Sequence, residues 1–205
     1  MEKILAKTFS YLFHPLLITS LGMLVLFNSG TSLSVLQFEV KKVALIVTML
    51  FTLVFPLLMI IILYLTRMIH NITLKEREER TLPLALTIIL YLFTFFIMRG
   101  IPQLTGTHIV FLFCPPAALF ATLVINRYMK PSIHMLGIGI LLGELLVLIL
   151  LYGAALHLFF ITAILIGGIL GSSRLILQAD KPGEILAGFS TGFLVTVIIM
   201  TSYAL

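Results

Sequence analysis

Long apolar segments separated by short polar ones dominate this chain. A helix needs about 20 mostly apolar residues, at roughly 1.5 Å each, to cross a membrane. Seven segments meet this criterion, at about 10–29, 43–66, 83–99, 108–127, 133–152, 154–172 and 184–204. The pattern predicts an all-α polytopic membrane helical bundle of about seven transmembrane helices, with residues 1–205 forming a single transmembrane domain.

Composition indicates that lipid is the solvent of this bundle. Of the 205 residues, 60% are hydrophobic and 10% are charged, whereas soluble domains are about 25% charged. The formal net charge of +5 does not indicate a nucleic-acid partner, because basic residues that flank apolar helices are typical of membrane topology. A lipid bilayer is therefore expected as the environment.

The polar segments between the apolar ones differ in character. Tyr152-Gly153 is a short turn signal between two apolar segments. Without a turn there, the forty residues 133–172 would form a single crossing, which needs only about 20 residues, so we expect two helices here. The charged segment from Arg67 to Arg80 predicts a short amphipathic surface helix that ends before Pro83.

Lysine and arginine are distributed unequally between the two sides of the predicted bundle. The amino terminus and the loops after the second, fourth and sixth segments hold ten of them, against three on the opposite side. Because cytoplasmic loops are rich in these residues, we expect a cytoplasmic amino terminus. The ten are Lys3, Lys7, Arg67, Lys75, Arg77, Arg80, Arg127, Lys130, Arg174 and Lys181, and the three are Lys41, Lys42 and Arg99.

Three polar clusters stand out as candidate chemistry, at 75–80, 130–134 and 173–184. Each follows an even-numbered segment, so a seven-pass topology brings all three to one face of the membrane. Lysine and arginine offer charged donors that match phosphate oxygens. The clusters therefore predict an anion-binding site, unless the side chains only extend from helix ends to the interface.

The clusters also carry three short motifs in a fixed order. The last one is Ser173-Arg174, five residues, Asp180, three residues and Glu184; the middle one is Pro131-Ser132-Ile133-His134; the first is Lys75 followed by Leu82-Pro83. In order and spacing the chain resembles the type 2 phosphatidic acid phosphatase superfamily, the lipid phosphate phosphatases related to vanadium haloperoxidases. The resemblance covers about residues 64–204 and implies a lipid phosphate phosphatase-like core in the cell (inner) membrane.

The resemblance implies a role for each matching residue. Lys75 and Arg174 would be phosphate ligands, and Ser132 would donate a hydrogen bond to the phosphate. His134 would protonate the leaving oxygen. Arg80 could supply the guanidinium that is missing at position 82. No cofactor and no metal is expected.

Two positions depart from the family pattern in a way that changes the chemistry. Asp180 stands where the nucleophilic histidine belongs, and Glu184 where an aspartate would orient that histidine. An anionic carboxylate repels a phosphate unless a cation or a proton intervenes. Asp180 could close an ion-pair cluster, form an aspartyl phosphate with a divalent metal, or stand aside while the pocket binds a headgroup.

The leading functional prediction is recognition of a lipid or isoprenoid phosphate headgroup with lost or altered hydrolysis. One alternative is an active phosphatase with a nucleophile other than histidine. The other is a non-enzymatic membrane scaffold or complex subunit. A homo-oligomer or a membrane partner is compatible with each of them.

Two further features belong to the apolar segments themselves. Glu144 lies eleven residues after the start of 133–152, about 16 Å along the helix and near the middle of the membrane. A carboxyl group at this depth is either a functional candidate or a protonated, neutral group that faces the interior of the bundle. Glycines four residues apart predict close helix packing, at Gly139 and Gly143, Gly167 and Gly171, and Gly188 and Gly192.

Overall fold

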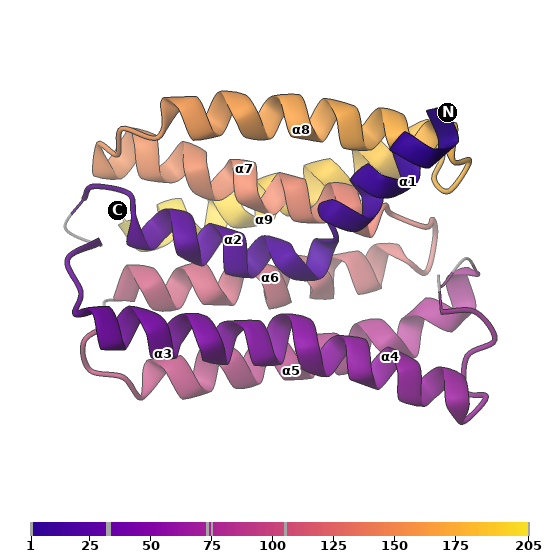
Figure 1. Ribbon diagram of the computed structural model, residues 1–205, viewed down its shortest axis with the longest axis horizontal. Helices are drawn as coiled ribbons and strands as arrows, with labels where there is room; N and C mark the ends of the chain where they lie inside the picture. Colours follow the sequence, from indigo (N-terminus) through magenta and orange to yellow (C-terminus); the bar gives the residue numbers. More distant parts are fainter. Residues whose placement is uncertain (1, 32–33, 73, 75, 105, 205) are drawn as a thin grey trace.

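The computed structural model describes residues 2–31, 34–72, 74, 76–104 and 106–204. These ranges contain nine α-helices, one π-helix and no strand (Figure 1). The elements are α1 (Glu2–Leu12), α2 (Pro15–Phe27), α3 (Phe38–Met49), η2 (Leu50–Val54), α4 (Phe55–Leu65), α5 (Arg77–Arg99), α6 (Gly106–Ile125), α7 (Ile133–Tyr152), α8 (His157–Ile176) and α9 (Pro182–Ala204).

Six of the described helices are long and apolar enough to cross a membrane. The first of them runs from Phe38 to Leu65 through α3, η2 and α4, and the others are α5 to α9. The pair α1 and α2 meets the same criterion jointly, with a bend of 55° between the two helices. The protein is therefore a multi-pass integral membrane protein with an all-α bundle, which confirms the predicted fold class.

The first span is not the continuous helix that 10–29 predicts. Pro15 has no backbone N–H and restricts the preceding residue, so His14 is extended, with φ −64° and ψ 135°. The Nδ1 atom of His14 accepts a hydrogen bond from the Leu16 N–H at 3.4 Å and thereby caps α2. The chain consequently turns between α1 and α2.

The prediction of a separate surface helix ending before Pro83 is wrong. Helix α5 begins at Arg77 and continues through Pro83 to Arg99. A proline this close to the start of a helix withholds a single N–H, the one that would pair with the Glu79 carbonyl, and the rest of the helix forms normally. As a result Arg80 belongs to the first turns of a spanning helix.

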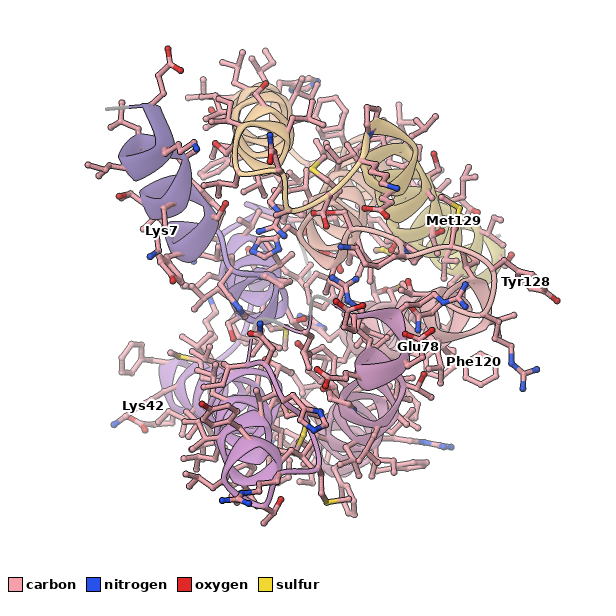
Figure 2. All side chains as sticks on the ribbon, turned by 90° about the vertical axis from the view of Figure 1, so that its right-hand side faces the viewer. Lys7, Lys42, Glu78, Phe120, Tyr128 and Met129 are labelled. Atoms are coloured by element: carbon pink, nitrogen blue, oxygen red, sulfur yellow. The ribbon has the colours of Figure 1, made fainter. Side chains whose placement is uncertain are left out.

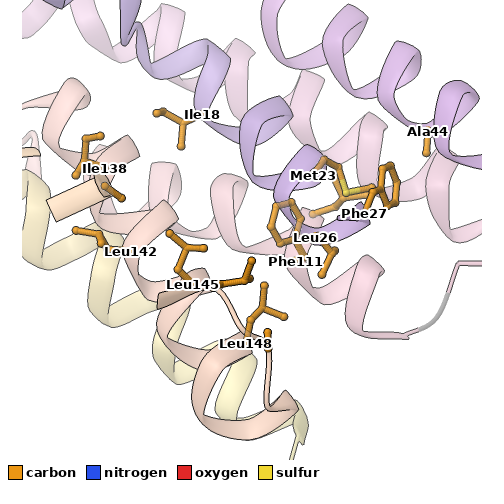
Figure 3. Packing of buried hydrophobic residues seen from close by; sticks show 14 of the residues in the cluster. Ile18, Met23, Leu26, Phe27, Ala44, Phe111, Ile138, Leu142, Leu145 and Leu148 are labelled. Atoms are coloured by element: carbon orange, nitrogen blue, oxygen red, sulfur yellow. The ribbon is translucent and has the colours of Figure 1, made fainter. Parts of the chain in front are cut away.

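Helix α7 lies at the centre of the bundle. Ile138, Leu142 and Leu145 extend from it into a core shared with α2 and α6, where Figure 3 shows Met23 and Phe111. On its other side α7 approaches α9 closely, because a Cβ atom on Gly192 would overlap the Leu136 carbonyl oxygen.

Other glycines of α7 and α9 also lie at the contact between these two helices. A Cβ on Gly139 or Gly188 would likewise meet the main chain of the facing helix, so the predicted close packing is confirmed for α7 and α9. These glycine contacts fix how the starts of α7 and α9 lie side by side.

The predicted turn after Tyr152 is confirmed as well, with Gly153 in the left-handed region at φ +63°.

Candidate functional site

Polar side chains gather at one end of the bundle, which faces the viewer in Figure 2. The start of α5, the turn that contains Tyr128 and Met129, and the turn between α8 and α9 all lie at this end. Arg77 Nη1 donates to the Tyr128 carbonyl at 3.2 Å and joins the first two of these segments. The structure thus brings the described parts of the three sequence clusters to the same end.

Asp180 is the centre of this polar end. Its side chain is 1% exposed, and its Oδ2 atom accepts hydrogen bonds from Ser132 Oγ at 2.7 Å and Arg174 Nε at 2.8 Å. Lys130 Nζ lies 3.8 Å from Oδ1 and donates to the Ala179 carbonyl at 2.9 Å. Two cations and a hydroxyl therefore surround one carboxylate, with Arg174 coming from α8 and the other two donors from the turn before α7.

The charge state of Asp180 follows from these contacts. Burial by itself raises the pKa of a carboxyl, but the hydrogen bond and charge of Arg174 oppose it, together with the Ser132 hydrogen bond and the Lys130 charge. The net effect lowers the pKa of Asp180 below its ordinary value. Asp180 is consequently an anion at neutral pH.

The helix starts explain how Ser132 reaches Asp180. Ser132 is the N-cap of α7, where its Oγ accepts from the Met135 N–H at 3.4 Å while its hydroxyl donates to Asp180. The Ser132 N–H donates to the Glu184 carbonyl at 2.8 Å. Glycine at position 188 permits this approach, because a Cβ there would overlap the Ser132 carbonyl.

Glu184 lies in the first turn of α9 and caps that helix. Its Oε2 accepts from the Lys181 N–H at 2.8 Å and lies 3.9 Å from Lys130 Nζ. Asp180 itself precedes the helix, so of the two carboxylates only Glu184 lies on the face of α9 that carries Gly188 and Gly192. Glu184 is therefore tied to the main chain and to Lys130.

Arg80 is buried beside the cluster. Its Nε donates to the Leu74 carbonyl at 2.7 Å and its Nη1 to the Pro131 carbonyl at 3.0 Å. It lies within Coulombic range of Asp180 and Arg174. These bonds fasten α5 to the turn that leads into α7. Lys75, the predicted first phosphate ligand, lies outside the described residues.

His134 faces α1. Its Nε2 lies 3.2 Å from the Ser10 carbonyl oxygen, and its ring packs edge-on against His14 with centroids 5.6 Å apart. The structure thus brings His134 into Coulombic range of Arg174 and Asp180, while its hydrogen-bond contact is with α1.

Sequence reasoning gave no specific role to Lys130 or His14. Lys130 could have been found, because it directly precedes the Pro131-Ser132 motif within a recognised cluster. His14 had no such signal, because its contact with His134 depends on how α1 and α2 bend.

His134, Asp180 and Glu184 do not form a metal-binding group. In the described part of the chain, no three or more His, Cys, Asp or Glu side chains come together in an arrangement that could hold a metal ion.

Comparison of the chain with models of protein families, with curated proteins and with solved structures finds no match.

Proposed function

We propose that this membrane protein binds the phosphate headgroup of a lipid or isoprenoid at the cluster around Asp180, without hydrolysing it. The observation that supports this most is the set of donors on the Asp180 carboxylate. Arg174, Ser132 and Lys130 are the charged and hydroxyl donors that a phosphate oxygen requires, and they already hold a small oxyanion.

Asp180 acts in this proposal as a built-in counter-anion. A buried ion pair is costly to break when one partner is left alone, so the carboxylate keeps the cations in place when no ligand is bound. An incoming phosphate competes with Asp180 for Arg174. In the phosphatase superfamily that the chain resembles, this position holds the nucleophilic histidine; an anion at this position repels the phosphorus centre instead.

An apolar groove supports a lipid as the source of the phosphate. It lies between α1 and α8, has a volume of about 630 Å³, and is lined largely by Leu5, Phe9, Leu165 and Ile169. Ser173, at the edge of this groove, directly precedes Arg174. A hydrocarbon chain in the groove would leave its headgroup close to the cluster, in the leaflet that the lysine and arginine distribution assigns to the cytoplasm.

The test is a titration of the purified protein in nanodiscs with phosphatidic acid, with diacylglycerol as the phosphate-free control. Arg174→Ala should weaken phosphatidic acid binding roughly 10- to 100-fold, because a charged hydrogen bond contributes about 1.5–3 kcal/mol. Arg127→Ala is the matched control, since Arg127 is exposed in the turn after α6. Equal affinity in wild type and Arg174→Ala contradicts the proposal.

A second candidate has support from the same bonds. The cluster connects the ends of α7, α8 and α9, as expected for an ion-pair lock in a scaffold subunit. Asp180→Asn separates the two: competition predicts about tenfold tighter phosphatidic acid binding, whereas a lock alone predicts lower stability and no gain in binding. Phosphate release that His134→Ala abolishes would contradict both and indicate an active phosphatase.

A further inference from the structure

A carboxyl group that takes no part in the site described above lies in the interior of the bundle. Glu144 on α7 is 1% exposed, and within the described residues neither of its carboxyl oxygens has a hydrogen-bond partner. It adjoins α2 at Gly22, where a Cβ atom would lie 2.8 Å from Oε2 and 2.6 Å from Phe111 Cζ. Helix α2 packs over this carboxyl because residue 22 has no side chain.

The helices around Glu144 provide no permanent charge to balance an anion. The sequences of α2, α6, α7 and α9 contain neither lysine nor arginine. The titratable groups of α6 are Cys114, which lies within Coulombic range of Glu144, and His108, one turn before Phe111. Helix α2 has none, those of α9 are Glu184 and Tyr203 near its ends, and those of α7 besides Glu144 are His134 and Tyr152 at its ends.

An ionised carboxylate in such surroundings is strongly unfavourable. Moving an unpaired charge from water into an apolar interior costs many kcal/mol, and intramembrane carboxylates accordingly face partners or water. With apolar Phe111 and the Gly22 backbone against it, the packed arrangement suits the neutral acid. Figure 3 shows the surrounding core, in which Met23 and Leu26 of α2 lie near Phe111.

We propose that Glu144 is a proton-binding site in the membrane interior, and that its bound proton keeps α2 packed against α6 and α7. When the O–H bond of the carboxyl breaks, the proton leaves to water and the carboxylate remains. That anion requires hydration, which the Gly22 contact excludes, so α2 must move away. The proposal is independent of the phosphate-binding proposal, because no residue is shared.

Movement of α2 has a route to the polar end of the bundle. His14 caps α2 and its ring packs against His134. A displacement of α2 therefore changes the surroundings of His134 as well, and couples the proton to the end of the bundle where Asp180 lies.

The proton itself is tested by infrared spectroscopy of the purified protein in lipid. Wild type at neutral pH should show the carbonyl-stretch band of a protonated carboxyl, shifted in D₂O and lost as the pH is raised. Glu144→Gln, which is nearly isosteric, should lack that band, and Glu39→Gln should retain it. Three results overturn the proposal: no band in wild type, a band that survives in Glu144→Gln, or a band that persists unchanged to the highest pH at which the protein stays folded.

The coupling to α2 is read from a thiol placed on α2. Met23 lies on α2 and is fully buried against the core that contains Phe111, so Met23→Cys in a Cys114→Ala background reacts with a maleimide when α2 moves away. Over the pH range in which the infrared band is lost, the labelling rate of this cysteine should rise at least severalfold more with Glu144 present than in Glu144→Gln. Because the thiol ionises equally in both proteins, Glu144→Gln corrects for that effect. Equal rates in both proteins overturn the role of α2.

Discussion

At the scale of single residues, Asp180 determines how the polar end responds to acid. Its contacts with Arg174, Ser132 and Lys130 lower its pKa below the ordinary value of about 3.9. The unfolded chain therefore takes up a proton before the folded protein does as the pH falls. The stability that these contacts contribute is fully present above the ordinary pKa and is lost as the pH falls through the folded pKa.

We predict that the melting temperature of wild type in detergent declines between about pH 5 and about pH 3 more steeply than that of Asp180→Asn. The asparagine cannot titrate, so it removes this contribution at every pH. Thermal unfolding followed by the circular dichroism of the helices measures the difference. Glu39→Gln, a substitution at an exposed position, should keep the wild-type slope; parallel curves for wild type and Asp180→Asn would rule out the assigned charge state.

At the scale of elements, the π-helix η2 interrupts the first long span next to a proline. Pro56 has no N–H to offer the Thr52 carbonyl, four residues earlier, and the chain forms an i+5 bond from Phe55 to Leu50 instead. The hydroxyl of Tyr91 on α5 donates to the Thr52 carbonyl at 3.0 Å. A side chain from a neighbouring helix thus replaces the donor that an α-helix would provide.

Tyr91→Phe should lower the free energy of unfolding by about 1–3 kcal/mol, because the buried Thr52 carbonyl then loses a donor. Tyr128→Phe is the control, since Tyr128 is 83% exposed and its change should stay within about 0.5 kcal/mol. Unfolding in a denaturing detergent compares the two. If both variants matched wild type, the Tyr91 hydrogen bond would have no part in stabilising η2.

The close contact of α7 and α9 gives a second prediction at this scale. Gly192→Ala places a methyl group against the Leu136 carbonyl, so the helices must separate, at a cost of about 1–3 kcal/mol or more. Gly183→Ala on the same helix meets nothing within 4 Å and should be neutral. Melting temperatures of the two variants test this, and equal values would mean that α7 and α9 pack less closely.

At the scale of the whole molecule, the apolar pattern predicted the bundle because lipid imposes a simple rule on span length. The predicted 108–127 and 133–152 lie close to α6 and α7. The pattern missed the bend at His14, because it counted apolar residues and gave no weight to Pro15, which restricts the residue before it. It placed Arg174 and Ser132 at one end by counting passes, but the His134 contact with Ser10 depends on helix rotation across 124 residues of sequence.

The number of passes determines where the termini lie. Helix α2 has 13 residues and a length of about 20 Å, too short for a hydrocarbon core of about 30 Å. Together α1 and α2 can complete one crossing, and Figure 1 shows the amino and carboxyl termini at opposite ends of the bundle. Seven crossings are therefore expected, with the lysine- and arginine-rich amino-terminal side in the cytoplasm.

We predict that a reporter that folds only in the cytoplasm is active when fused to the amino terminus and silent when fused to the carboxyl terminus. The same reporter fused after residue 181, in the turn between α8 and α9, should be active, because α9 is then absent. A reporter that works only outside the cytoplasm should give the reverse pattern. Activity of the cytoplasmic reporter at both termini would mean six crossings, with α1 and α2 entering and leaving the membrane on one side. Helix α2 would then be a re-entrant segment, and Glu144 would contact it from within a six-helix bundle.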